Sequence, residues 1–248
     1  MPDSRTALIT RDFVAAINEI VRRHDITHDE YRSTIDFLTE AVSKGETSLL
    51  FDAFLESDVV AANAEKQEGT PQQVLGPFYL PDMPWLENGQ LAGDNEPGER
   101  LTVQGTVRGT NGESLGGSEL DFWQCDAEGR YSNFMPGLPD GHLRGRMKSE
   151  NDGSYTLKTI RPSPYTIPHE GPTGRLLNEL GRHPWRPAHL HVIARHEGYR
   201  PLTSQVYFQG DKYLDSDAVR AATNKLAFAL SKDENGSVMN FDIELEAV

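Results

Sequence analysis

The chain has 248 residues, a formal net charge of −14 at pH 7, 37% hydrophobic residues and one cysteine, Cys125. This length allows one sizeable core, or one core with a small accessory region. The acidic balance argues against nucleic-acid binding, which needs a basic surface. A lone cysteine excludes an intrachain disulfide and a cysteine-rich zinc site.

Neither membrane insertion nor export is indicated by the sequence. No apolar stretch is long enough to span a bilayer, and the first residues lack the charged-then-apolar order of a signal peptide. We therefore expect a cytoplasmic protein that acts on a small molecule, with neither nucleic acid nor membrane as a partner.

Residues 4 to about 66 show the apolar spacing of helices. Thr27 as N-cap, with Glu30 three residues later, predicts a capping box at the start of the second helix. Lys44-Gly45 predicts the end of that helix. Three such helices cannot bury their apolar faces alone, so we expect them to pack on the rest of the chain, on a second subunit or on a lipid-like ligand.

From about Thr70 the pattern changes to short strands separated by turn residues, such as Asn111-Gly112. Strands are predicted at residues 101–107, 120–124, 154–160, 189–194, 204–208 and 239–245. Many short strands of this kind are typical of an antiparallel β-sandwich. Residues 220–230 fit either a short helix or an irregular segment, and the long polar loop 81–100 is of the kind that shapes a pocket. We therefore expect a mainly β fold with α, divided into a helical region (1–70) and a β-sandwich (71–248).

His189 and His191 are the most informative candidate site residues. Side chains at i and i+2 leave the same face of a strand, so the two imidazoles share one space and make half of a first-row metal site. The alternative is a pair of ordinary strand histidines. Tyr131, just past a strand, and Tyr165, in a stiff segment with three prolines, are candidate partners or simply core aromatics.

Several motifs in order give the chain a family resemblance. They are Leu75-Gly76-Pro77-Phe78-Tyr79, Phe122-Trp123-Gln124, Gly129-Arg130-Tyr131-Ser132, Leu143-Arg144-Gly145-Arg146, Pro164-Tyr165-Thr166-Ile167-Pro168, the run Gly181-Arg182-His183-Pro184-Trp185-Arg186-Pro187-Ala188-His189-Leu190-His191, and Leu202-Thr203-Ser204-Gln205. Through them, residues 71 to 215 resemble the intradiol ring-cleaving dioxygenases of the catechol 1,2-dioxygenase type. The N-terminal helices also resemble the helical region that joins two subunits in this branch.

The resemblance implies one non-haem Fe(III) per subunit, held by Tyr131, Tyr165, His189 and His191 with a hydroxide. Two phenolates and a hydroxide balance three positive charges, leaving a neutral site that a buried pocket tolerates. Tyr165 is implied to be the displaceable ligand that accepts a proton from the diol. Arg186 is implied to stabilise negative charge on the ring, although a structural ion pair is the alternative role for it.

Gln205 is implied to hold the geometry of the site. The resemblance also implies a substrate pocket lined by Leu75, Gly76, Pro77, Phe78 and Pro81, with Ile167 opposite. This mostly apolar set suits catechol, or a methyl- or chloro-substituted catechol, cleaved with O2 to a cis,cis-muconate. Some segments instead look closer to hydroxyquinol 1,2-dioxygenases, whose product is maleylacetate. Asp82 is either the polar partner that such a substrate needs or a solvated loop charge.

Two other classes of function stay open from the residues alone. The chain could be a β-sandwich module that only binds or scaffolds, or a metal hydrolase that uses the two histidines. The absence of a His-Glu-x-x-His motif weakens the hydrolase alternative. We expect a homodimer through the N-terminal helices, with a phospholipid as a possible occupant of the apolar groove between subunits.

Overall fold

The structure of the protein, a computed structural model, describes residues 4–248. The chain divides into two compact units, one ending at Thr47 and the other spanning Ser48–Val248. The first unit contains α1 (Arg5–Arg23) and α2 (His28–Ser43). The predicted capping box is confirmed, since Glu30 N donates to Thr27 Oγ1 at 3.3 Å and Thr27 N donates to Glu30 Oε2 at 2.8 Å.

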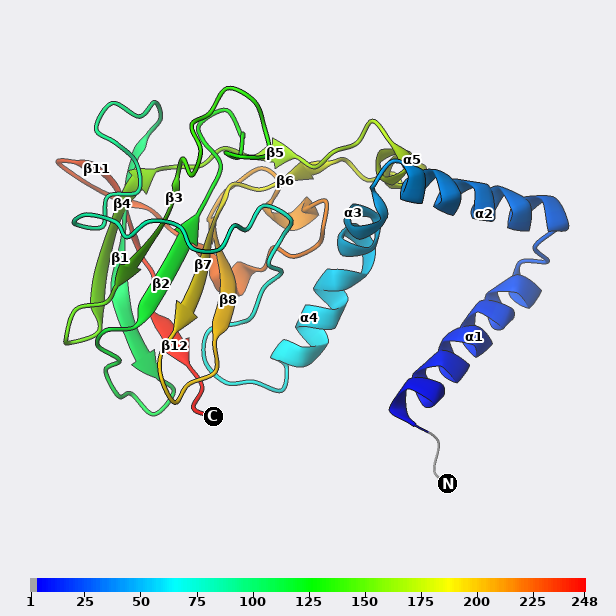
Figure 1. Cartoon of the computed structure of the whole chain (residues 1–248), viewed down its shortest axis with the longest axis horizontal. Helices are drawn as coiled ribbons and strands as arrows, with labels where there is room; N and C mark the ends of the chain where they lie inside the picture. The colour runs from blue at the N-terminus through cyan, green and yellow to red at the C-terminus, as the bar shows by residue number, and fades with distance from the viewer. Residues whose placement is uncertain (1–3) are drawn as a thin grey trace. The chain divides into compact units, whose positions relative to one another are not determined.

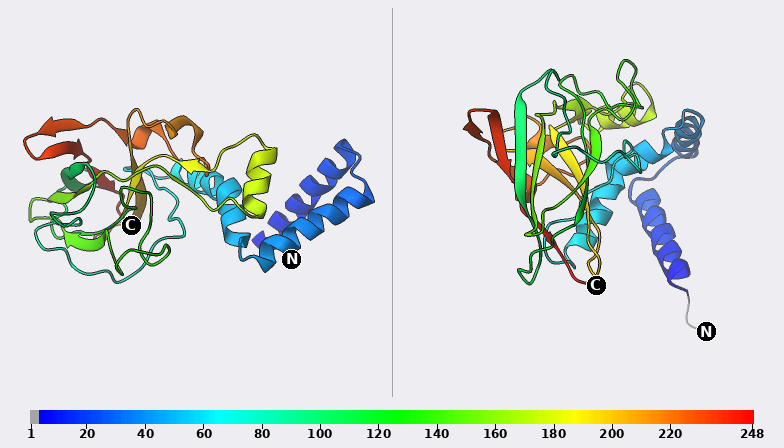
Figure 2. Two further views of the ribbon diagram at one scale, coloured as in Figure 1. Left: turned by 90° about the horizontal axis from the view of Figure 1, so that it is seen from above. Right: turned by 60° about the vertical axis from the view of Figure 1, so that its left-hand side comes forward.

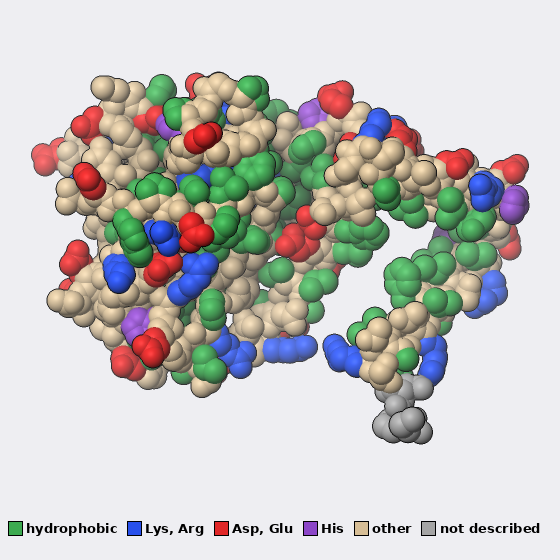
Figure 3. Space-filling view, in the orientation of Figure 1, with side chains coloured by type: hydrophobic (Ala, Val, Ile, Leu, Met, Phe, Trp, Pro, Cys, Tyr) green, Lys and Arg blue, Asp and Glu red, His purple; other side chains and the backbone are tan. Residues whose placement is uncertain are grey.

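The helix α1 is strongly amphipathic and leaves its apolar side chains at the surface of the described chain. Figure 3 shows hydrophobic side chains gathered on this helix. The exposed ones include Ile9, Phe13, Val14, Ile17, Ile20 and Val21. Within residues 4–248, no helix combines the length and the apolar character that a membrane crossing requires.

The second unit opens within a continuous helical segment of three parts, whose first residue, Thr47, is the last of the first unit. These are α3 (Thr47–Phe51), a π-helical turn (Asp52–Glu56) and α4 (Ser57–Ala64). Helical structure to residue 64 confirms the prediction for this region. Its residues Ala53, Phe54 and Val60 pack with an apolar cluster on the β-domain, beside β7 and β8 in Figure 1. A π-helical turn is rare and often occurs at functional sites.

Two five-stranded sheets form the sandwich, which Figure 2 shows from two further directions. One sheet has the order β10-β11-β1-β12, with β4 also pairing with β1, and the other has the order β3-β2-β7-β8-β9. The strands are β1 (Arg100–Gly109), β2 (Glu119–Trp123), β3 (Arg144–Lys148), β4 (Ser154–Ile160), β7 (His189–Arg195), β8 (Leu202–Phe208), β9 (Ala227–Phe228), β10 (Ser231–Asp233), β11 (Gly236–Asn240) and β12 (Ile243–Leu245). The short pair β5 (Tyr165–Thr166) and β6 (Trp185–Arg186) lies outside these two sheets.

The sandwich is confirmed, but its sheets are mixed rather than purely antiparallel. The strand β1 pairs parallel with both β11 and β12, and β8 pairs parallel with β9. The prediction of a single strand at 239–245 is wrong. Two separate strands, β11 and β12, occupy this region, and the residues between them are not in a strand. There Asp242 Oδ1 accepts from Thr106 N at 2.8 Å, and Phe241 O would lie 2.0 Å from a Cβ added to Gly105.

Residues 220–230 form no α-helix, so the irregular alternative is the correct one. They contain a 3₁₀ turn (Asn224–Leu226), whose N-cap Thr223 accepts from Lys225 N, followed by β9. The sequence analysis also missed β3 and α5 (Pro172–Glu179). The strand β3 lies at the edge of its sheet and has mostly polar residues, so it lacks the apolar alternation by which strands are predicted.

The strand β7 is buried on both faces, and this positions the candidate site. Leu190, Val192 and Ala194 belong to the core between the two sheets. The alternate residues His189, His191 and Ile193 leave the opposite face, because strand side chains alternate. Ile193 joins the second apolar cluster, which also contains Trp123, Tyr131, Tyr165 and Ala53. The two histidines therefore lie on the face that this second cluster covers.

Candidate metal centre

His189 and His191 are fully buried neighbours on one face of β7. Their Nε2 atoms lie 3.1 Å apart, and their ring centroids are separated by 4.8 Å. The Nδ1 atom of His189 lies 2.7 Å from Pro187 O, which fixes the proton on Nδ1 and makes Nε2 the nitrogen with a lone pair. Trp123 stacks on the His191 ring at 4.5 Å with 12° between the planes.

Both imidazoles are held in their neutral form. Burial and the nearby Arg186 guanidinium lower the pKa of His189 to about 3. Burial and the neighbouring His189 lower the pKa of His191 well below its usual value. A neutral imidazole presents a lone pair, which is the form that binds a metal.

Two tyrosines from separate loops complete the cluster. Tyr165 is on β5, where it pairs with Arg186 of β6. Tyr131 follows a tight turn in which Asp126 Oδ1 accepts from Arg130 N at 2.8 Å. The ring centroids are 5.4 Å apart for Tyr131 and Tyr165, 5.5 Å for Tyr165 and His189, and 6.5 Å for Tyr131 and His191.

A glycine in this turn allows the two tyrosine loops to approach. Gly129 has φ +80°, and a Cβ added there would lie 2.9 Å from Tyr165 Cβ and 3.3 Å from Pro164 O. Only glycine adopts this backbone angle without strain and also leaves room for the second loop.

The donor set fits a metal cation. Within residues 4–248, no group of three or more His, Cys, Asp or Glu side chains is placed to hold a metal. Tyr131 Oη and His191 Nδ1 are buried polar atoms with no hydrogen-bond partner among the described residues. Burial raises the pKa of both Tyr131 and Tyr165, so only a nearby cation would ionise these phenols at neutral pH.

Arg186 and Gln205, both predicted, lie beside this cluster and contact each other. Arg186 Nη2 donates to Gln205 Oε1 at 3.0 Å, and Arg186 Nη1 donates to His189 Nε2 at 3.2 Å. The structure adds two residues that the sequence analysis missed. Asp217 forms a buried ion pair with Arg186, and Tyr207 Oη donates to Gln205 Oε1 at 2.8 Å. Asp217 follows other polar residues in the chain, so sequence alone indicates a solvated charge.

A narrow pocket opens beside Tyr165 and Arg186. Its volume is about 30 Å³, room for about two water molecules. Its walls are Leu49, Asp52, Glu56, Val74, Gly76, Pro77, Phe78, Tyr165, Ile167, Pro168, Arg186 and Val219. The predicted wall residues Leu75 and Pro81 lie outside this lining.

The helical segment contributes a pocket wall that the sequence analysis missed. Burial raises the pKa of Asp52. Burial and the proximity of Asp52 raise the pKa of Glu56, against the attraction of Arg186. In contrast, the Asp82 side chain is 92% exposed and lies 4.0 Å from Arg146, as expected for a solvated loop charge. The acidic groups that face the pocket are therefore on the π-helical turn.

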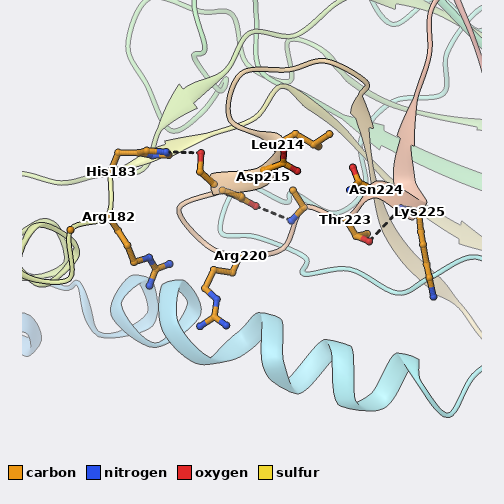
Figure 4. A pocket seen from close by; sticks show the side chains of 12 residues that line it. Arg182, His183, Leu214, Asp215, Arg220, Thr223, Asn224 and Lys225 are labelled. Carbon is orange, nitrogen blue, oxygen red and sulfur yellow. Dashed lines mark hydrogen bonds between the residues drawn. The ribbon is translucent and has the colours of Figure 1, made fainter.

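A larger, polar cavity of about 630 Å³ lies elsewhere, and Asp217 is part of its wall. Figure 4 shows Arg182, Arg220 and Lys225 reaching from its loops toward the helical segment below, and the hydrogen bond of 2.9 Å between His183 Nε2 and Ser216 Oγ. None of the four candidate metal ligands lines this cavity.

Comparison with known proteins shows which family the chain belongs to. Residues 74–247 match the family described as Dioxygenase, and residues 3–70 match the family described as Catechol dioxygenase N terminus. A chlorocatechol 1,2-dioxygenase of Rhodococcus opacus is 40% identical over 238 residues, covering 94% of this chain and 92% of that protein. A 6-chlorohydroxyquinol 1,2-dioxygenase of Cupriavidus pinatubonensis is 37% identical over 252 residues, covering 98% and 91%.

The crystal structure of the chlorocatechol 1,2-dioxygenase from Pseudomonas putida superposes with a TM-score of 0.94 at 37% identity, covering 98% of this chain and 99% of that one. The likeness therefore extends over the helical region and the β-sandwich together. The matched families, the relatives and the shared fold lead to one conclusion: the chain belongs to the intradiol ring-cleaving dioxygenases.

Proposed function

We propose that the protein binds one non-haem Fe(III) per subunit and uses O2 to cleave an aromatic 1,2-diol between its two hydroxyl-bearing carbons. The product is a cis,cis-muconate. The observation that carries this proposal is the convergence of two neutral imidazoles, whose Nε2 atoms face each other, and two buried phenols, with Tyr131 Oη unpartnered among the described residues. The activities named for the relatives support the reaction class.

Tyr131, Tyr165, His189 and His191 are the proposed iron ligands. Two phenolates and a hydroxide neutralise the charge of a ferric ion, which suits a site that excludes water. A phenol whose pKa is raised by burial ionises only against a strong positive charge, so occupancy by a trivalent cation and ionisation of Tyr131 are coupled.

Tyr165 is the proposed proton acceptor. A neutral diol has to lose two protons before both oxygens can bind a metal, and bound Fe(III) supplies the Lewis acidity that makes this loss favourable. Of the four proposed ligands, only Tyr165 lines the pocket. Tyr131 is fully buried and its ring stacks on Phe78 at 4.5 Å. Tyr165 is therefore the proposed ligand that borders the path of an incoming substrate.

Arg186 is proposed to stabilise negative charge on the diol ring. Its guanidinium lines the pocket and points Nη1 at His189. A fixed cation in a water-excluded site lowers the energy of developing negative charge. Gln205 supports this geometry, since its Nε2 donates to Val74 O at 2.6 Å while its Oε1 accepts from Arg186.

An unsubstituted, methyl- or chloro-substituted catechol is the proposed substrate class. Apolar side chains make up much of the pocket wall, and an apolar wall suits such substituents. They are Leu49, Val74, Pro77, Phe78, Ile167 and Val219.

Hydroxyquinol, with maleylacetate as product, is the second candidate, because Asp52 and Glu56 also line the pocket. A buried carboxyl or carboxylate can accept a hydrogen bond from a third hydroxyl group. A relative whose name includes chlorohydroxyquinol supports keeping this candidate.

The helical region is proposed to join two subunits, with a phospholipid as a possible occupant of the apolar groove between them. The exposed apolar side chains of α1 support this role. Residues 1–70 are proposed to form the dimerisation region, and residues 71–248 are proposed to form the catalytic domain. Leu49, Asp52 and Glu56 of the first of these regions also line the pocket, so the helical segment is proposed to serve the catalytic domain as well.

The proposed function is tested by metal exchange. The metal is removed, the protein is reloaded with Fe(III) or Zn(II), and absorbance follows the formation of muconates from catechol and 4-chlorocatechol and of maleylacetate from hydroxyquinol. We expect turnover with iron alone, and the ranking of the three diols assigns the substrate. Turnover with zinc would contradict the proposal, and iron-loaded protein that binds a diol without converting it would favour a binding module.

A further inference from the structure

Hydrogen bonds to Asp217 and Gln205 engage two of the three guanidinium nitrogens of Arg186. Nε donates to Asp217 Oδ1 at 3.0 Å, and Nη2 donates to Asp217 Oδ2 at 3.2 Å. Nη2 also donates to Gln205 Oε1 at 3.0 Å and lies 3.4 Å from Tyr207 Oη. Nη1 alone is directed at the candidate metal centre, where it meets His189 Nε2 at 3.2 Å.

Asp217 is itself locked in place. Besides the two guanidinium nitrogens, its Oδ1 accepts from Val219 N at 3.3 Å, and its Oδ2 accepts from Ala221 N at 3.1 Å and from Ala222 N at 3.0 Å. Five donors use all the acceptor positions that a carboxylate offers. The side chain is 2% exposed, so water has little access to the carboxylate.

The charge state of the pair agrees with this geometry. Burial alone would raise the pKa of Asp217, but the Arg186 guanidinium lowers it below the usual value. Both partners are therefore ionised, and two parallel N–H···O bonds fix the plane of the guanidinium as well as its position. Once His189 Nε2 binds a metal, Nη1 loses its acceptor and becomes the free donor beside the pocket.

We propose that Asp217 is the positioning residue for Arg186: it holds Nε and Nη2, and so keeps Nη1 pointed at the substrate position beside His189. Through its bonds to Val219 N and Ala221 N it also orders the turn that brings Val219 into the pocket wall. This inference rests on the proposed function of Arg186 in diol cleavage, and it adds a residue that is neither a proposed iron ligand nor part of the pocket lining.

If Asp217 positions Arg186, its substitution should lower kcat more than it changes KM or the iron content. Asp217→Asn keeps the size of the side chain but replaces one acceptor oxygen with a donor and removes the charge. The guanidinium is then free to turn, and misplacement of a charge-stabilising group by about 1 Å costs roughly 10²-fold in rate. We expect kcat to fall by about that factor while KM and the iron content per chain change little. Asp217→Glu, which retains the carboxylate, should recover part of the loss.

The control is Asp215→Asn, an exposed acidic residue two positions away, which should behave as wild type. A double-mutant cycle then separates positioning from general support of the fold. In an Arg186→Gln background, Asp217→Asn should lower kcat little further, because the group that it positions is already gone. Losses that multiply across the two sites would overturn the inference, as would an unchanged kcat in Asp217→Asn.

Two further readouts do not depend on turnover. Iron content and the affinity for catechol under anaerobic conditions, from a visible titration, should stay close to wild type in Asp217→Asn. A variant that loses iron and unfolds at a lower temperature in proportion to its activity would mark Asp217 as structural only. Absence of turnover in the wild-type protein would instead contradict the proposed function, before any variant is compared.

Discussion

At the scale of single residues, the two tyrosines have different environments despite their similar chemistry. Tyr131 has no exposed surface and lies under Phe78, whereas Tyr165 is 5% exposed and lines the pocket. Burial raises the pKa of both phenols. A ligand that must leave the metal and accept a proton has to be reachable from the pocket, and this requirement separates their proposed roles.

Tyr165→Phe should therefore retain part of its iron and lose most of its turnover, because the proton acceptor is removed while three ligands remain. Tyr131→Phe should lose iron more completely, because it removes the phenol that is buried behind the pocket. Iron per chain and single-turnover rates measure both effects. Undiminished single turnover in Tyr165→Phe would contradict its role.

Glu56 gives a prediction about stability and pH. Burial and Asp52 raise its pKa in the folded protein above the unfolded value. A raised pKa in an acid means that the folded state holds the proton more tightly, so this stabilisation is complete below about pH 4 and is lost as pH rises through the folded pKa. Glu56→Gln should thus raise the melting temperature relative to wild type at neutral pH, with a smaller difference near pH 4.

The matched control for this prediction is Glu87→Gln, at an exposed loop position. Melting curves across the pH range, recorded for both variants, provide the comparison. A Glu56→Gln difference that is independent of pH, or a variant less stable than wild type at neutral pH, would contradict the effect of burial.

At the scale of elements, the site depends on loops brought together by strands. The strand β7 supplies both histidines, the β5–β6 pair supplies Tyr165 and Arg186, and a tight turn after β2 leads to Tyr131. The turn and the β5 loop approach so closely that Gly129 has no room for a side chain.

Gly129→Ala should destabilise the protein by about 1–3 kcal/mol, since it combines backbone strain at positive φ with a contact against Tyr165. It should also alter the phenolate-to-iron absorption, because Tyr165 has to shift. Gly112→Ala is the matched control. Its φ is +85°, and an added Cβ meets nothing within 4 Å, so it should show strain alone. Urea unfolding and visible spectra report the two effects; equal spectra in both variants would contradict the proposed contact.

Element prediction from sequence succeeded where the periodicity was local. The capping box at Thr27 and the strand at 154–160 depend on neighbouring residues, and both were found as predicted. The break between β11 and β12 depends on contacts with Gly105 and Thr106, far away in the chain, so no local pattern reveals it.

The same distinction applies to the candidate site. Placing His189 and His191 on one face requires only the two-residue period of a strand. Their own segments made Tyr131 and Tyr165 candidate partners or simply core aromatics, and only the family resemblance implied that they are ligands, because they come from separate loops. Asp217 could not be predicted, since only tertiary packing decides that this acidic residue is buried.

At the scale of the whole molecule, the protein combines a β-sandwich with helices that expose apolar side chains in the single chain. The hydrophobic stripe of α1 includes Phe13, Ile17 and Ile20. An unpaired apolar stripe of this size is typical of a surface that another molecule covers. We proposed a second copy of the chain as that molecule.

Phe13→Asp should shift the mass in solution from dimer to monomer, because it places a charge in the apolar stripe. Ala15→Asp adds the same charge to the opposite face of α1 and should leave the dimer intact. Sedimentation or light scattering at several concentrations gives the masses. A wild-type monomer, or a Phe13→Asp dimer as stable as wild type, would contradict the assignment of the helices to dimerisation.

The central claim is a ferric site with two phenolate ligands that activates a diol toward O2. Its most direct test is the visible spectrum of the purified protein, recorded before and after anaerobic addition of catechol and again after air is admitted. We predict a burgundy protein whose absorption moves to longer wavelength with catechol and then bleaches as muconate absorbance grows. A protein that stays colourless after iron loading would contradict the account.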